Sequence, residues 1–316
     1  VVRSALGIIF SKNPDHFDWP HLYFYPTILM YMGFAFLRNL FESLNLRNLL
    51  SSVAPIIWND DLIFYLLSRI LSAVIGTFTI IPVFLAGKNL FDKKTALFSA
   101  LAFSIIPFHV WHSHYALIDV PMIFFLSWAL YFGVLIIKSN HIKYYVLSGL
   151  FVGLAASTKY HGGLGAIIIP LAYLVWYFSR NKKDKTKFLR IHDIKKMGAS
   201  GVSALFGFLF GTPFALLDFD TFSRTDSPSG ALWQFTNVGS VSFTKRIEQI
   251  IDALLVKVNN DLGYVIMFVY LIGLLVLIYR FVKKTNFRNN LKLLFLYVPS
   301  MFFIYYISGF EKTRSH

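Results

Sequence analysis

The sequence predicts an all-α, multi-pass transmembrane bundle of about eight membrane helices, with an external first-loop helix and a long external loop. The first observation is composition, because 56% of the 316 residues are hydrophobic and 15% are charged. Soluble domains carry about 25% charged residues. The second is run length, since apolar stretches of about 15–25 residues suffice to cross a bilayer core. These runs are continuous rather than alternating, which favours helices over barrel strands.

The apolar runs define the expected helices in chain order. Segment 22–41 comes first, after a loop rich in proline and histidine. No inverted repeat and no fixed-period repeat is present in the pattern. We treat residues 1–316 as a single transmembrane domain. The remaining expected helices are 62–86, 96–107, 121–137, 144–158, 163–179, 197–217, 262–280 and 291–309.

Charge divides the connectors into two sets. The first set holds 18 of the 30 lysines and arginines but three of the 16 acids, so the positive-inside rule makes it cytoplasmic. The net charge of +14 is then an orientation signal and an attraction to anionic lipid, and nucleic-acid binding is not expected. The cytoplasmic set is 87–95, 138–143, 180–196 and 280–292, and the external set is about 1–61, 108–120, 159–162, 218–261 and 310–316.

Groups able to carry a proton gather on the expected external side. Seven of the nine histidines and 13 of the 16 acids lie there. The absence of cysteine excludes disulfides, thiol nucleophiles and Cys-ligated zinc. Helices 96–107 and 144–158 are short for a full crossing and are expected to leave an external recess, which loop 218–261 can cover. If the protein is an enzyme, its site therefore faces outward.

Asp119 is the sharpest candidate for chemistry. It precedes Pro121 at the start of a long apolar run, where a carboxylate is a favourable N-cap and proline is tolerated in the first turn. The same position aims an ionised carboxylate at the mouth of the recess, as a general base or metal ligand requires. A zinc site of His109, His112 and His114 is the weaker alternative, because these residues do not share one helical face.

Two cations also suggest a site. Lys159 lies in the short connector before Gly162 and Gly163, where it either snorkels to the interface or binds an anion beside flexible backbone. Arg69 lies eight residues into segment 62–86, or about 12 Å along the helix axis. A guanidinium at such depth is costly and usually marks a site or a buried ion pair.

The first loop and the tail complete the external set. The loop carries Asp15, His16 and Asp18 among aromatic residues that either form an interfacial belt or line a groove for a sugar or lipid chain. The tail adds Arg314, whose guanidinium can hold a phosphate by two hydrogen bonds.

Five motifs occur in a fixed order along the chain. They are Asn13-Pro14 with Phe17-x-x-Pro20, Arg69 with Gly76-Thr77, Ser113-His114-x-Ala116-x-x-Asp119-x-Pro121, Gly149-x-x-x-Gly153-Leu-Ala-Ala-Ser-Thr-Lys159-Tyr160 and Gly211-Thr-Pro-Phe-Ala-Leu-Leu-Asp218. With these motifs the chain resembles GT-C membrane glycosyltransferases of the protein O-mannosyltransferase and aminoarabinose-transferase type, which are similar to glycosyltransferase family 39. We expect it to be part of a longer protein that also has a first helix and further C-terminal helices.

The resemblance implies a hexosyl- or pentosyltransferase in the plasma membrane. It would move a sugar from a polyprenyl-phosphate donor to a protein, lipid or glycan acceptor at the outer face, with a divalent cation as a possible cofactor. The phosphate must be neutralised by cations and the acceptor needs a base. By resemblance, Asp119 matches the acid of the second external loop, Lys159 the lysine that contacts the donor phosphate, and Arg69 a site-structuring arginine that can also contact the phosphate. The family's principal base is expected upstream of Asn13, with Asp15 and Asp18 as stand-ins among the catalytic acids, and Arg314 is a further candidate phosphate ligand. The expected substrate-lining residues are His114, Tyr160, His161, His16 and Asp218.

Two other classes remain open from the sequence. A transporter or lipid-carrier flippase would place ionisable groups near the bilayer midplane and show repeated halves, whereas here Arg69 alone penetrates. A non-catalytic membrane scaffold would tolerate loss of Asp119, whereas an enzyme would lose transfer and stay folded.

Overall fold

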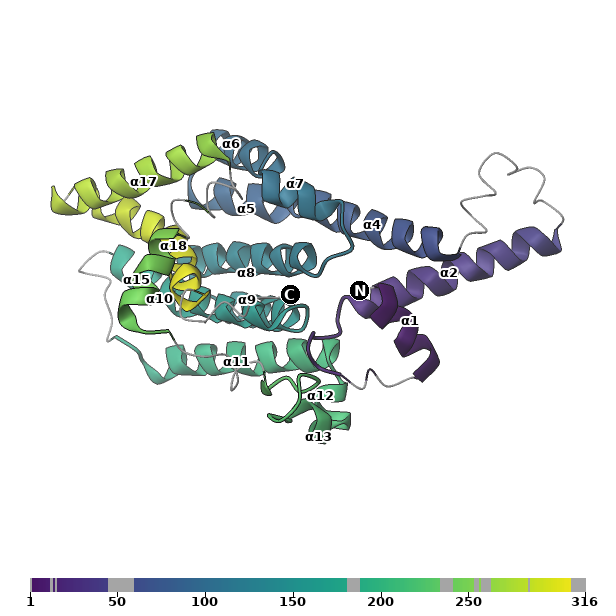
Figure 1. Ribbon diagram of the computed structural model, residues 1–316. Helices are drawn as coiled ribbons and strands as arrows, with labels where there is room; N and C mark the ends of the chain where they lie inside the picture. The colour runs from purple at the N-terminus through teal and green to yellow at the C-terminus, as the bar shows by residue number, and fades with distance from the viewer. Residues whose placement is uncertain are drawn as a thin grey trace.

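The computed structural model describes most of the chain as an all-α protein (Figure 1). The expected fold class of a helical membrane bundle is thereby confirmed. The described residues are 2–11, 14, 16–44, 60–180, 188–233, 241–252, 256, 263–283 and 285–307.

Helices α8 (Asp119–Ser139), α9 (Ile142–Ala156) and α11 (Ile191–Gly211) run side by side through the middle of the molecule (Figure 1). A Cβ atom at Gly149 or Gly153 of α9 would collide with the backbone of α11 at Ser200 and Ala204. Glycine is therefore required where these two helices cross.

The second predicted helix is divided into α4 (Asp60–Phe78) and α5 (Ile80–Leu90), with the break at Thr79. The next predicted helix is bent by 58° between α6 (Lys93–Ser104) and α7 (Pro107–Ser113). Pro107 starts α7, since proline cannot donate the amide hydrogen that a continuous helix needs.

The expected helix 163–179 begins with a 3₁₀ segment, because three glycines occur in its first turns. The core lies between α8, α9, α10 and α18 and includes Ala129, Val152, Ile169 and Phe295. The remaining elements are α1 (Val2–Ser11), α2 (Phe24–Ser43), η2 (Tyr160–Ile167), α10 (Ile168–Ser179), α12 (Phe214–Leu217), α13 (Phe219–Phe222), α15 (Phe243–Asp252), α17 (Tyr264–Val282) and α18 (Phe287–Ile307).

Within the described residues, four helical stretches are long and apolar enough to cross a membrane, and five if the bent α6–α7 pair is one span. This is fewer than the eight expected, because α9 has 15 residues and other helices are more polar over a full crossing length. The four stretches are Leu62–Leu90, Asp119–Ser139, Tyr160–Ser179 and Tyr264–Val282.

The two ends of the bundle differ in their side chains. At one end the Lys138 ammonium donates to the Asn89 amide oxygen at 3.0 Å and so joins two lysine-rich connectors. Asp193 and Lys196 of α11 form a buried ion pair at 3.3 Å. Because α8 and α9 form a hairpin, Asp119 and Lys159 both lie at the other end, which we call the Asp119 end.

Candidate functional site

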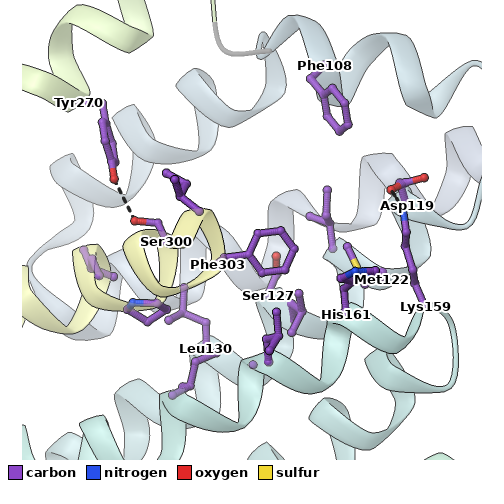
Figure 2. A pocket seen from close by; sticks show the side chains of 18 residues that line it. Phe108, Asp119, Met122, Ser127, Leu130, Lys159, His161, Tyr270, Ser300 and Phe303 are labelled. Atoms are coloured by element: carbon purple, nitrogen blue, oxygen red, sulfur yellow. Dashed lines mark hydrogen bonds and ion pairs between the residues drawn. The ribbon is translucent and has the colours of Figure 1, made fainter. Parts of the chain in front are cut away.

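The candidate site is a groove of about 820 Å³ between α8, η2, α17 and α18. Figure 2 shows Asp119 and Lys159 at one end of the groove and the hydrogen-bonded pair Tyr270 and Ser300 at the other. Apolar side chains form most of the wall between these ends. They are Phe108, Met122, Ile123, Leu126, Leu130, Leu164, Ile168, Leu296, Phe303 and Ile304, with Gly165 and Pro299 among them.

Asp119 and Lys159 form an ion pair at the head of the groove. The Lys159 Nζ donates to Asp119 Oδ1 at 2.7 Å, and the two side chains are 25% and 22% exposed. Asp119 is the first residue of α8 and Ile118 is the N-cap, so the expected capping role of Asp119 is wrong. The carboxylate instead accepts the hydrogen bond from Lys159, and both charges remain open to the groove.

His161 is the third polar residue at this end of the groove. It belongs to η2, two residues after Lys159, and its ring lies edge-on to Tyr306 of α18 with centroids 6.0 Å apart. The 3₁₀ geometry of η2 thus turns His161 toward the same space as the ion pair (Figure 2).

The first loop packs against Lys159 and Tyr160. The Tyr160 hydroxyl donates to the Phe17 carbonyl at 2.8 Å, and the Lys159 ammonium lies 5.8 Å from the centre of the Trp19 ring. His16 Nε2 is 3.6 Å from Asp18 Oδ1, while Tyr160 points to the loop and lies outside the groove wall.

His21 is buried beneath the first loop and hydrogen-bonds to its backbone. Its ring Nε2 donates to the His16 carbonyl at 2.9 Å, and the side chain is fully buried. Burial lowers the pKa of His21 to about 4, although the hydrogen bond to His16 acts in the opposite direction. His21 is therefore neutral at physiological pH and serves packing.

Arg69 lies outside the groove wall. Its Nε donates to the His114 carbonyl at 2.6 Å, and its guanidinium lies 5.9 Å from the centre of the Tyr115 ring. Arg69 therefore anchors the connector that leads to Asp119. The ring of His114 pairs with the Val110 carbonyl at 2.7 Å and also lies outside the groove wall.

Asp218 is separate from the groove. The Asp218 carboxylate accepts from the Thr221 amide at 3.4 Å and caps α13. Asp15 and Arg314 lie outside the described residues. In the part of the chain that the structure describes, no three His, Asp or Glu residues are grouped as metal ligands. The His109 and His112 rings each pair with a backbone carbonyl.

Sequence reasoning did not identify the wall contributed by α18. Pro299, Ser300 and Phe303 belong to an ordinary apolar helix, and no spacing distinguishes them from lipid-facing residues. The one sequence signal is the proline inside α18, Pro299, since proline kinks a helix.

Comparison with known proteins finds similarity to protein mannosyltransferases. Residues 66–192 match the family model of dolichyl-phosphate-mannose-protein mannosyltransferases. This segment includes Arg69, Asp119, Lys159 and His161. The dolichyl-phosphate-mannose–protein mannosyltransferase 1 of Saccharomyces cerevisiae is 28% identical over 163 residues, which are 48% of this chain and 18% of that protein.

A crystal structure of the oligosaccharyltransferase of Archaeoglobus fulgidus, in complex with Zn and sulfate, aligns with a TM-score of 0.49 and 17% identity. The alignment covers 92% of this chain and 39% of that one. The chain thus spans less than a fifth of the yeast relative and about two fifths of the archaeal protein. The resemblance inferred from the motifs is confirmed over residues 66–192, where the chain is similar to the mannosyltransferase family.

Proposed function

We propose that the protein transfers a sugar from a polyprenyl-phosphate donor to an acceptor at the outer face of a membrane. The observation that carries this proposal is the groove, which combines a long apolar wall with one charged end. A lipid phosphate has the same division between an apolar chain and a charged head. The mannosyltransferase match makes dolichyl-phosphate mannose the first donor to test.

The apolar wall suits the polyprenyl chain. The α8 residues along it run from Asp119 to Leu130, which is about 16 Å at 1.5 Å per residue. Transfer of an isoprenoid chain from water to such a wall is favourable by about 25 cal/mol for each Å² buried. A chain lying in the groove brings its phosphate to Lys159.

Lys159 is the proposed phosphate ligand. Its charge is balanced by Asp119, so an arriving phosphate competes with this carboxylate for the ammonium. Binding then releases Asp119 beside the reacting sugar. Arg314 remains a candidate for a second phosphate contact, and Arg69 supports the site through the His114 carbonyl.

The proposed reaction is a displacement at the anomeric carbon. An acceptor hydroxyl forms the new carbon–oxygen bond, the bond to the phosphate oxygen breaks, and Asp119 takes the hydroxyl proton. Lys159 stabilises the charge on the departing polyprenyl phosphate. The configuration inverts in a single displacement of this kind. Asp15 and Asp18 are the alternative bases, and His161 completes the polar lining.

The test uses the full-length protein in lipid vesicles. Dolichyl-phosphate mannose carrying radiolabel in the sugar should lose its label in the presence of peptide, lipid or glycan acceptors. Lys159→Met should abolish this loss, whereas Lys138→Met, which changes a lysine at the other end of the bundle, should not. No release of label from a broad panel of polyprenyl-phosphate sugars would overturn the proposal. Movement of intact donor between leaflets would indicate a flippase.

A further inference from the structure

Residues 16–22 form a fixed platform beside the ion pair. The Phe17 carbonyl accepts from the Tyr160 hydroxyl at 2.8 Å, and the Leu22 amide donates to the Ser157 carbonyl at 3.0 Å. These bonds tie both ends of the platform to the segment that carries Lys159. The platform and the ammonium therefore keep a defined relative position.

Trp19 is the exposed residue of this platform. Phe17, Pro20 and His21 are buried, whereas 43% of Trp19 is accessible. Its indole lies 5.8 Å from the Lys159 ammonium, within the range of a cation–π contact. Lys159 also lines the groove, while Trp19 lies outside the groove wall. The ammonium thus adjoins two different surfaces, one apolar groove and one open aromatic face.

A polyprenyl-phosphate sugar has two arms that leave the same phosphate. With the phosphate on Lys159 and the lipid arm in the groove, the sugar arm extends to the space beside the ammonium that Trp19 borders. A pyranose presents a face of C–H groups, whose partial positive charge is attracted to the negative face of an indole ring. Trp19 supplies such a face without further ordering, because its loop is already fixed.

We propose that Trp19 is the donor-sugar platform, a residue that binds the sugar of the lipid-linked donor next to Lys159. This inference rests on the proposed function and adds the subsite that recognises the sugar arm. Trp19 takes no part in proton transfer. It contributes affinity for the sugar-bearing lipid and none for the same lipid without sugar.

The experiment compares two probes on the full-length protein in nanodiscs. Equilibrium binding is measured for dolichyl phosphate and for dolichyl-phosphate mannose with wild type, Trp19→Phe and Trp19→Leu. Trp111→Leu is the matched control, because Trp111 is also exposed and lies outside the groove wall. Trp19→Leu should weaken binding of the mannose lipid about threefold to tenfold and leave dolichyl phosphate unchanged. Trp19→Phe should bind the mannose lipid with an affinity between those of wild type and Trp19→Leu. The control Trp111→Leu should bind both lipids as wild type does.

Two results would overturn the inference and leave the transferase proposal standing. Equal weakening for both lipids would mean that Trp19 acts by holding the Lys159 side chain. No weakening for either lipid would mean that the indole is an interfacial anchor. The proposed function fails separately, when Lys159→Met binds both lipids as well as wild type does.

Discussion

Asp119→Asn should change donor binding and sugar transfer in opposite directions. The Lys159 Nζ lies 2.7 Å from Asp119 Oδ1, so the proposed function requires a donor phosphate to displace this carboxylate before it gains the ammonium. Asparagine keeps the size of the side chain and one oxygen acceptor, but it removes the charge that competes with the phosphate. The variant should therefore bind dolichyl phosphate more tightly and transfer sugar more slowly.

The exposure of the pair sets the magnitude. Fully exposed ion pairs contribute about 0–1 kcal/mol, and loss of one partner in a buried pair costs about 3–5 kcal/mol. Lys159 and Asp119 are 25% and 22% exposed, between these limits. A difference of about 1–2 kcal/mol corresponds to roughly fivefold to thirtyfold tighter binding. Loss of the base should slow transfer by about 10²–10⁴.

The assay is equilibrium binding of dolichyl phosphate in nanodiscs, paired with a single-turnover transfer measurement. Asp226→Asn is the matched control, because Asp226 pairs with Arg224 at 3.1 Å on an exposed surface away from the groove. It should change neither quantity. Weaker or unchanged phosphate binding by Asp119→Asn would refute the competition between carboxylate and donor.

Three further predictions concern stability and pH, each measured by thermal unfolding in detergent micelles. Gly149→Ala should destabilise the protein by about 1–3 kcal/mol, because the added Cβ collides with the backbone of α11. Gly201→Ala should not destabilise it, because nothing lies within 4 Å of a Cβ there. Equal unfolding midpoints for the two variants would contradict the close crossing of α9 and α11. Asp193→Asn leaves the buried Lys196 ammonium without its carboxylate and should lower the free energy of unfolding by about 3–5 kcal/mol without altering lipid binding. An unchanged unfolding midpoint would show that the pair is not buried. Burial lowers the pKa of His21 to about 4, so between about pH 6.5 and pH 4 the unfolded chain binds a proton at His21 that the folded chain does not, and stability should fall as the pH drops through this range. The His21→Phe variant should show a weaker dependence of its unfolding midpoint on pH. Identical pH profiles for variant and wild type would contradict this prediction.

The helical class and the placement of Asp119 and Lys159 at one end of the bundle both follow from local features of the sequence. Apolar runs define helices, and short connectors require consecutive helices to return, so 108–120 and 159–162 come to one end. The structure places the Lys159 ammonium on the Asp119 carboxylate at that end. The ion pair itself was not predicted, because the sequence does not specify which side chains meet at that end.

The groove wall and the position of Arg69 depend on packing, which the sequence does not encode locally. Arg69 was expected at depth by counting residues, but the count cannot tell which face of α4 meets the connector at His114. Phe303 lines the groove only because α18 returns beside α8 after the 147 residues that separate Ser139 from Phe287. The contact between Trp19 and Lys159 likewise requires the loop to be tied down at Tyr160.

The most direct measurement of the central claim is a structure of the full-length protein in a lipid nanodisc with dolichyl phosphate bound. The account predicts a phosphate oxygen about 2.8 Å from the Lys159 Nζ, the contact between Lys159 and Asp119 broken, and the isoprenoid chain along α8 and α18. A phosphate bound elsewhere, with the 2.7 Å ion pair intact and the groove empty of lipid chain, would contradict it.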